Sequence, residues 1–162
     1  METNTSEWKT VEKMMDRTAS FYLDPETELL YRTRPDQFLS QLTQYKFIAK
    51  LIGPHQEILD LTQAETIGRS ILKAECGSVS THAAEGEKFD AIILSDVNSC
   101  VNSLPFLNPN GLMFLKEKQK YFENVRSIFQ HIFFFSVVRE VILTGLHPSA
   151  ESFLVVAQGW KL

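Results

Sequence analysis

Apolar residues recur at three- and four-residue spacing in two stretches near the amino terminus, and this spacing predicts helices. The first stretch runs from Thr5 to about Leu23, with the apolar positions Trp8, Val11, Met14, Met15 and Ala19. A polar link around DPETE follows. The second stretch covers residues 35–53, and Pro35 and Gly53-Pro54 suit its two ends. Its inward positions are Phe38, Leu42, Tyr45, Ile48, Ala49 and Ile52.

The next apolar runs are short and rich in isoleucine, leucine and valine, which is typical of buried strands. EILDL is followed by a polar turn and the helical stretch TIGRSILKAE, so strand, turn and helix begin a βα unit. FDAIILSD predicts a second strand, and GLMFL predicts a third after the turn LNPN. The segment CGSVSTHAAEGEK is ambiguous, and NSCVNSLPF has room only for a short helix.

The carboxyl-terminal part predicts one more helix and two strands. KEKQKYFENVRSIFQ forms the amphipathic helix, with the inward positions Tyr121, Phe122, Val125, Ile128 and Phe129. HIFFFSVV and SFLVVAQGW form the strands, joined by the loop REVILTGLHPSAE. Strands that alternate with helices predict an α/β fold with a mostly parallel sheet, and the last two strands predict an antiparallel end. We expect a single domain over residues 1–162, in which residues 1–35 form an amino-terminal helical extension that packs across the larger body.

The composition and net charge of the chain limit the kinds of binding partner that are expected. The chain has 162 residues, 44% of them hydrophobic, and a formal net charge of −4. This charge gives no general attraction to nucleic acids or anionic membranes. The start METNTSEWKT has no apolar signal core, and no run approaches the roughly 18 apolar residues of a membrane span. Cys76 and Cys100 form no CxxC pair, which favours reduced thiols and a cytoplasmic location. We therefore expect neither a nucleic-acid partner nor a membrane partner.

Motifs for metal, hydrolase or nucleotide chemistry are missing from the sequence. The four histidines, His55, His82, His131 and His147, are scattered, so no metal site is expected. There is no GxSxG elbow and no GxxxxGK[ST] loop. A triad of Ser95, Asp96 and His147 across the sheet cannot be recognised from sequence order. The charged run KEKQK is interpreted as a solvated surface in preference to a site for an acidic partner.

The order of the predicted elements resembles that of the class I S-adenosylmethionine-dependent methyltransferases. Four local matches carry this resemblance: QYKFIAKLIG leading into ILDL, FDAIILSDV with its trailing acidic residue, LNPNGLMFL as the turn into the fifth strand, and the last two strands around Thr144-Gly145 and Pro148. They span most of the chain after residue 40. The resemblance implies a Rossmann-like, mostly parallel sheet with helices on both faces and a carboxyl-terminal antiparallel hairpin.

The stretch that aligns with the family's cofactor turn departs from the family pattern. The family's first motif, DxGxGxG, aligns with Asp60, Thr62, Ala64 and Thr66, so the acidic residue is present and all three glycines are replaced. Glycines at these positions allow a tight turn and a close approach of the backbone to the cofactor. Side chains would occupy that space, and any aligned position that needs a positive φ would be strained by about 1 kcal/mol or more. Gly68 comes two residues late, inside the predicted helix.

The middle of the chain is also shorter than the family pattern. The family places two further βα units between its first and fourth strands, with an acidic residue at the end of the second strand that holds the cofactor's ribose. Only 30 residues separate Asp60 from Asp90, which is room for about one unit. The only candidate for the second strand, CGSVS, is preceded by Glu75, so no ribose anchor is identified. We expect a reduced number of strands in this region.

Two functions remain open after these comparisons of motif and length. The first is a methyltransferase-like domain that has lost S-adenosylmethionine and acts as a structural or protein-interaction subunit, joined to a protein partner or a second copy at an exposed sheet edge. Asp60 is then a polar strand end that caps the next helix, and Asp96 is a solvated strand end. The alternative is an active small-molecule or sugar methyltransferase with an atypical cofactor site, in which Asp60 holds the cofactor's amino group and Asp96 faces the transferred methyl. No catalytic residue is identified.

Overall fold

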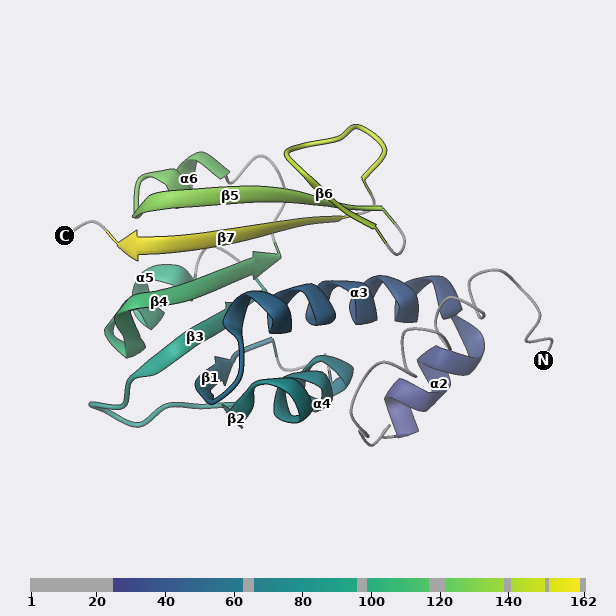
Figure 1. Cartoon of the computed structure of the whole chain (residues 1–162), viewed down its shortest axis with the longest axis horizontal. Coiled ribbons are helices and arrows are strands. Elements are labelled where there is room, and N and C mark those ends of the chain that lie inside the picture. The colour runs from purple at the N-terminus through teal and green to yellow at the C-terminus, as the bar shows by residue number, and fades with distance from the viewer. Residues whose placement is uncertain are drawn as a thin grey trace.

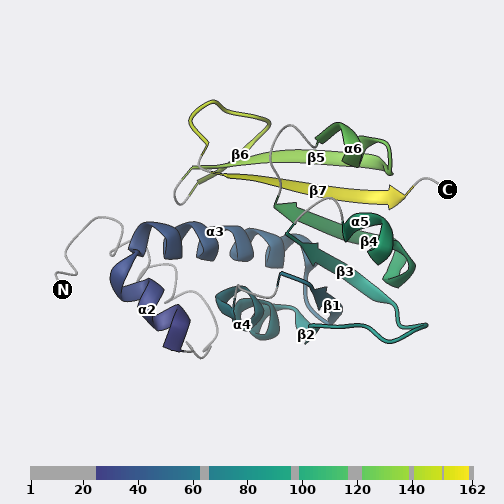
Figure 2. The ribbon, with the colours of Figure 1, turned by 180° about the vertical axis from the view of Figure 1, so that it is seen from behind.

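A sheet of seven strands forms the centre of the molecule (Figure 1). The computed structural model describes residues 25–62, 66–95, 99–116, 122–138, 141–150 and 152–160. The strands are β1 (Gln56–Asp60), β2 (Gly77–Ser80), β3 (Phe89–Leu94), β4 (Leu107–Lys116), β5 (Phe129–Val138), β6 (Val141–Thr144) and β7 (Ser152–Trp160). Their order is β2-β1-β3-β4-β7-β5-β6. The strands from β2 to β5 can be followed from bottom to top in Figure 2, and β6 pairs with β5 at the end of the sheet. The first four strands in this order are parallel and the last three are antiparallel, as the sequence predicts.

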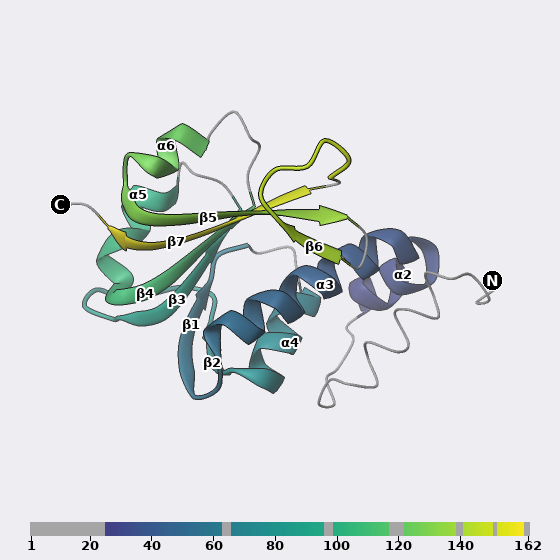
Figure 3. The same cartoon turned by 45° about the horizontal axis from the view of Figure 1, so that its top comes forward.

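Helices cover both faces of the sheet. Figure 3 shows α3 (Pro35–Ile52) and α4 (Thr66–Glu75) on one side, and α5 (Cys100–Ser103) and α6 (Phe122–Arg126) on the other. The short 3-10 helix η2 (Leu104–Phe106) follows α5, and α2 (Pro25–Thr33) packs against α3. None of the described helices is long and apolar enough to span a membrane.

The hydrophobic core is divided by the sheet into two clusters. Ile58 packs into the cluster beneath α3 and α4, whereas its neighbour Leu59 packs into the cluster on the opposite face. This division follows from strand geometry, because successive side chains of a strand point to opposite faces. Strands that are buried on both faces have continuous runs of apolar residues. FDAIIL of β3 is such a run, in which Asp90 is the single polar residue.

The amino-terminal half agrees with the sequence prediction except at the link before α3. α3 begins at Pro35, and the Gly53 N–H donates to the Ala49 carbonyl at its end. α4 has the bounds that its sequence predicts. The polar link predicted around DPETE is wrong, because Pro25–Thr33 is helical and begins at a proline that suits a first helical position. The helix predicted from Thr5 to Leu23 lies outside the described residues.

Three predictions for the carboxyl-terminal half were wrong in detail. β4 begins at Leu107 and includes the predicted turn LNPN, although its pairing with β3 is interrupted there. The described part of the last helix is only Phe122–Arg126, because Phe129 pairs with Trp160 and opens β5. The predicted loop REVILTGLHPSAE contains β6, which pairs with β5 and so gains hydrogen bonds that its own sequence does not specify.

Between β1 and β3 the chain forms one short strand, β2, within the described residues. Residues 81–88 then return to β3 without forming a helix. The expected loss of part of a βα pair is thus seen here. In the part of the chain that the structure describes, β2 pairs only with β1, so the outer edge of the parallel part is a four-residue strand.

Candidate functional site

The turn after β1 lies at the carboxyl end of the parallel strands (Figure 1). From β1 the chain passes through α4 to β2 on one side, whereas from β3 it passes to β4 on the other side. The strands β1 and β3 are neighbours, so the direction of winding changes between them. Open α/β sheets bind their ligands at such a switch point, outside the carboxyl ends of the strands. The side chains at this turn are therefore the first place to look for a binding site.

Asp60 and Thr62 bond to each other within this turn. Asp60 is only 1% exposed, and its Oδ1 accepts a hydrogen bond from the Thr62 N–H at 3.0 Å. The same oxygen accepts a second bond from the Thr62 hydroxyl at 2.5 Å. On the other side of the carboxylate, Oδ2 lies 3.7 Å from Nε of Arg69, which stands on α4. Arg69 thus places an opposite charge near the buried carboxylate, and Thr62 supplies two charge-assisted hydrogen bonds to its Oδ1.

Tyr45 of α3 lies against the described part of this turn. Its hydroxyl lies 3.2 Å from Oγ1 of Thr62, and its side chain is fully buried. Its ring lies directly against Gly68, where an added Cβ would come within 2.3 Å of ring carbons. Lys116, the last residue of β4, places Nζ 5.4 Å from the centre of the same ring. Gly68 thus allows α4 to approach the tyrosine ring, and this close packing accounts for a glycine inside the helix.

The replaced glycines do not strain the described part of the turn. Among the described residues other than glycine, a positive φ occurs only at His55, so Thr62 and Thr66 adopt ordinary backbone angles. Thr62 is 7% exposed and occupies the position of the family's first glycine with a bonded side chain. The turn is therefore compatible with threonine because it does not need the left-handed conformation there.

Two positions that the resemblance assigns to cofactor binding can be located among the described residues: Asp60 and the end of β2. Asp60 is engaged by Thr62 and Arg69. β2 ends at Ser80 and is followed by Thr81 and His82, so no carboxylate stands at the end of the second strand. Among the described residues, the expected ribose-binding carboxylate is thus not found at the end of β2, and Asp60 bonds within the protein.

The structure brings together two of the five residues predicted for the cofactor site. Asp60 and Thr62 are in contact, and Thr66 opens α4. Ala64 and Asp96 lie outside the described residues. The sequence did not predict the part played by Tyr45, Arg69 and Lys116. Tyr45 was expected only as a core residue, although a buried tyrosine hydroxyl needs a partner and could have indicated a polar neighbour.

The other candidate groups take structural roles. His147 lies beyond β6, which three strands (β4, β7 and β5) separate from β3 in the sheet. Its backbone N–H donates to Ser136 Oγ at 2.8 Å. No group of three metal-ligating side chains occurs in the part of the chain that the structure describes. Cys76 and Cys100 are both buried free thiols. Burial, with a smaller contribution from the Glu75 charge, raises the pKa of the Cys76 thiol from 9.0 to about 11, so this thiol is a poor nucleophile.

The fold is similar to that of known methyltransferases. The tRNA (m1A58) methyltransferase TrmI from Aquifex aeolicus superposes with a TM-score of 0.56 and 12% identity, over 74% of this chain and 69% of that chain. A putative methyltransferase from Streptococcus mutans in complex with SAH gives a TM-score of 0.48 at 10% identity, over 75% and 96%. The plantazolicin methyltransferase BpumL in complex with SAH gives 0.42 at 10% identity, over 95% and 100%. No family model matches the sequence, and no curated protein is similar to it. At these identities the likeness to the first structure establishes the fold: this chain has the Rossmann-like fold of the class I S-adenosylmethionine-dependent methyltransferases.

Proposed function

We propose that this chain is a methyltransferase-fold domain that has lost S-adenosylmethionine binding and acts as a structural or protein-interaction subunit. The observation that carries the proposal is the buried Thr62, whose hydroxyl bonds to Asp60 and lies within hydrogen-bonding distance of Tyr45. A cofactor tail that approached the backbone here would have to displace this hydroxyl. Removal of a donor from a buried carboxylate costs about 1–3 kcal/mol, so the closed turn opposes binding.

The edge of the sheet formed by β6 supports the interaction role. Among the described strands, β6 pairs only with β5. Val141–Thr144 contains no charged residue. Exposed apolar side chains occur on β5, on β6 and after β6: Phe133 is 57% exposed, Val141 46% and Leu146 40%. An unpaired strand edge with apolar neighbours favours pairing with a strand of another chain. A second copy of this chain is the simplest occupant, and a different protein partner is the other.

Calorimetric titration with S-adenosylmethionine and S-adenosylhomocysteine, together with thermal shift, tests the loss of the cofactor. A ligand at 100 times its dissociation constant stabilises a protein by about 2.7 kcal/mol, so even modest affinity would be measurable. We expect neither heat nor a shift at millimolar ligand. Saturable binding to the wild-type chain would overturn this part of the proposal.

Light scattering after size exclusion tests the interaction role. We expect a wild-type mass above that of the 18.5 kDa monomer, and monomers for Val141→Lys, because a lysine on an edge strand opposes pairing. Leu29→Lys is the matched control, since Leu29 is exposed on α2 away from the sheet edge. A wild-type chain of monomer mass that also co-purifies with no stoichiometric protein would contradict the proposal.

The alternative function is an active small-molecule or sugar methyltransferase with an atypical cofactor site. It is favoured by Asp60, which stands at the end of β1 beside the switch point, as the resembled family's acidic residue does. Under this alternative Asp60→Asn weakens binding of the cofactor, and Asp96→Asn slows methyl transfer. Transfer of a labelled methyl group from S-adenosylmethionine to any acceptor would establish it.

A further inference from the structure

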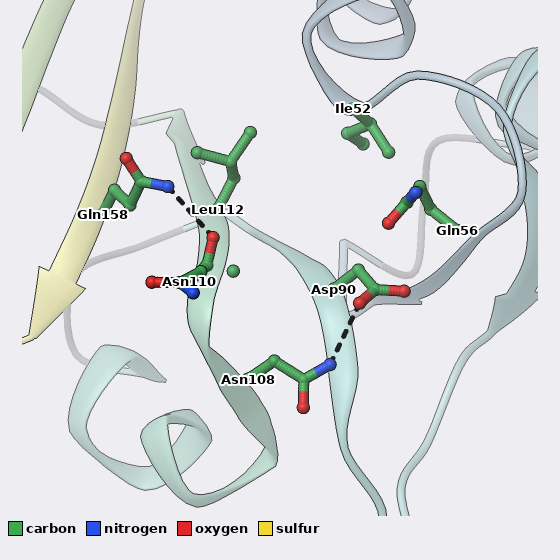
Figure 4. A pocket seen from close by; sticks show the side chains of 8 residues that line it. Ile52, Gln56, Asp90, Asn108, Asn110, Leu112 and Gln158 are labelled. Carbon is green, nitrogen blue, oxygen red and sulfur yellow. Dashed lines mark hydrogen bonds between the residues drawn. The ribbon is translucent and has the colours of Figure 1, made fainter.

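A hollow of about 310 Å³ lies at the opposite edge of the sheet, near the amino ends of β1 and β3 (Figure 4). Small-molecule pockets in proteins begin at about 300 Å³, so the hollow has room for a small metabolite. Five polar side chains contribute to its lining: Gln56, Asp90, Asn108, Asn110 and Gln158. They come from the start of β1, β3 and β4 and from the end of β7, and in Figure 4 they surround the hollow from several sides.

An irregularity in β4 builds this hollow. Phe89 pairs with Leu107, but the next pair is Ala91 with Leu112, so β4 advances five residues while β3 advances two. Four residues of β4, 108–111, therefore stand opposite the single residue Asp90 of β3 and form a bulge. Bulges redirect side chains and are frequent beside functional sites. The hollow therefore results from the interrupted pairing of β3 and β4, because regular pairing would have continued the sheet through this region.

Gly111 allows the backbone of β4 to pack closely within the bulge. A Cβ at this position would lie 2.6 Å from Cδ1 of Leu107 and 2.9 Å from the backbone oxygen of Asp90. Contacts this short with backbone cannot be relieved by a rotamer change. The bulged conformation therefore depends on glycine here.

Three amide side chains at the hollow have their orientation fixed by hydrogen bonds. The Asn108 Nδ2 donates to Asp90 Oδ1 at 3.0 Å, a bond drawn in Figure 4. The Gln158 Nε2 donates to the Asn110 carbonyl at 3.0 Å, and the Gln56 Nε2 donates to the Pro54 carbonyl at 3.2 Å. Carbonyls and carboxylates only accept, so the bonding atom of each amide is its nitrogen.

The lining consequently offers more hydrogen-bond acceptors than donors. Each of the three amide nitrogens retains one hydrogen, whereas each amide oxygen retains two lone pairs. Asp90 adds a carboxylate, which accepts the Glu57 N–H at 2.8 Å in addition to Asn108 and has acceptor capacity left. Asp90 is also the only charged side chain in the lining, all of which the structure describes. The hollow therefore favours a ligand that donates hydrogen bonds and carries positive charge.

We propose that this hollow binds the ammonium group of a small aliphatic amine. Asp90 supplies the opposite charge, the amide oxygens supply further acceptors, and Ile52 and Leu112 provide an apolar wall for the methylene groups. Charge-assisted hydrogen bonds are about twice as strong as neutral ones. An ammonium is thus favoured over a hydroxyl of the same size. The site is independent of the proposed function, because it lies at the other end of the strands from Asp60.

Titration with 1,4-diaminobutane at low salt tests this site, with 1,4-butanediol as the neutral probe and calcium chloride as the inorganic cation. We expect saturable binding of the diamine and at least ~tenfold weaker binding of the diol, following the strength of charge-assisted bonds. Absence of diamine binding at millimolar concentration, equal binding of the diol, or binding of calcium alone would each overturn the proposal.

Variants locate the binding to the hollow. Asp90→Asn is expected to weaken diamine binding at least ~tenfold through loss of the charge. Because this variant also disturbs the bonds to Glu57 and Asn108, Gln56→Met provides a second test that removes one acceptor and keeps the side-chain length. Gln37→Met, on an exposed position of α3, is the matched control and keeps wild-type affinity. Wild-type affinity in both Gln56→Met and a folded Asp90→Asn would place the binding elsewhere and refute the site.

Discussion

The polar side chains at the two ends of the parallel strands differ in how they use their hydrogen-bonding groups. At the carboxyl end, Asp60 and Thr62 bond to each other, and the hydroxyls of Thr62 and Tyr45 face each other in a buried turn. At the amino end, Asn108 and Gln158 bond to the protein through their nitrogens and have oxygens to offer. Hydrogen bonds within the protein reduce what the Thr62 hydroxyl and Asp60 Oδ1 can offer to a ligand. The usual binding edge of a fold therefore does not by itself identify a site.

Two glycines produce this contrast. Gly68 lets α4 pack against the ring of Tyr45, which closes the carboxyl end. Gly111 lets β4 bulge around Asp90, which opens the amino end. The glycines that the resembled family uses at the first turn are absent, whereas the chain places a glycine at each of these two close contacts. A substitution of either glycine is therefore expected to perturb only the end of the parallel strands at which that glycine lies.

Gly111→Ala is expected to have the largest effect. Because the new Cβ meets backbone atoms of β3 and β4, we expect a loss of about 3 kcal/mol in the free energy of unfolding, at the upper end for overpacked sites. Diamine binding should be lost with the bulge. Urea denaturation and calorimetry measure the two effects. Gly86→Ala is the control, since it has no atom within 4 Å and only the cost of its φ of +86°, about 1 kcal/mol. Equal losses in the two variants would show that the bulge does not depend on Gly111.

Gly68→Ala is expected to cost about 2 kcal/mol, because overpacking against Tyr45 exceeds the gain of about 1 kcal/mol from helix propensity. Urea denaturation gives the loss. The double variant Gly68→Ala/Tyr45→Leu should show a smaller effect of the alanine, since the shorter side chain makes room. Diamine affinity should stay at its wild-type value. An alanine that stabilises the protein would mean that the helices are not in close contact at this point.

The pH dependence of stability provides a test at Cys76. The thiol pKa is raised from 9.0 to about 11 in the folded protein. The unfolded chain therefore loses this proton at lower pH than the folded chain, so the contribution to stability is complete below pH 9 and is lost as the pH rises from 9 to 11. The loss amounts to about 2 kcal/mol by pH 11. Stability curves of Cys76→Ala should lack this decline relative to the wild type, whereas those of Cys100→Ala should keep it. The same decline in both variants would refute the assignment.

The elements that the sequence predicts well are those whose pattern is local. α3, α4 and β7 have bounds that follow from apolar spacing, proline and glycine. The sequence did not predict β6, because its strand conformation depends on hydrogen bonds to β5. A pattern of four residues does not indicate which strand they pair with. The bulge in β4 was taken for a turn for the same reason, since asparagine, proline and glycine favour both, and only the register against β3 distinguishes them.

The sequence predicts where the first turn lies, whereas the hydrogen bonds within it are not predicted; the assignment of the turn to cofactor binding stays a prediction. The alignment placed Asp60 and Thr62 at the first turn, where the structure also has them. Their mutual hydrogen bonds depend on backbone angles at Thr62, and the part of Tyr45 depends on how α3 crosses the end of β1. The amino-end hollow was not foreseen, because Asp90 and Asn108 are brought together only by an irregular register. A regular strand pair would have placed Asn108 elsewhere.

The smallest expected effect concerns the link between Tyr45 and Thr62. The Thr62 hydroxyl has one hydrogen and donates it to Asp60, so the Tyr45 hydroxyl has to donate to Thr62, and the two bonds form a directed chain. A double-mutant cycle of Tyr45→Phe and Thr62→Val, followed by urea denaturation, should give a coupling of about 1 kcal/mol. Tyr31→Phe replaces Tyr45→Phe in the control cycle, and its effect should add to that of Thr62→Val within about 0.5 kcal/mol. Thr62→Val should cost more than Tyr45→Phe, because it removes a donor from the buried carboxylate as well.

Zero coupling would mean that the tyrosine does not hold the threonine in place. The carboxyl end would then be as open to a ligand as the amino end, and the contrast between the two ends would be lost.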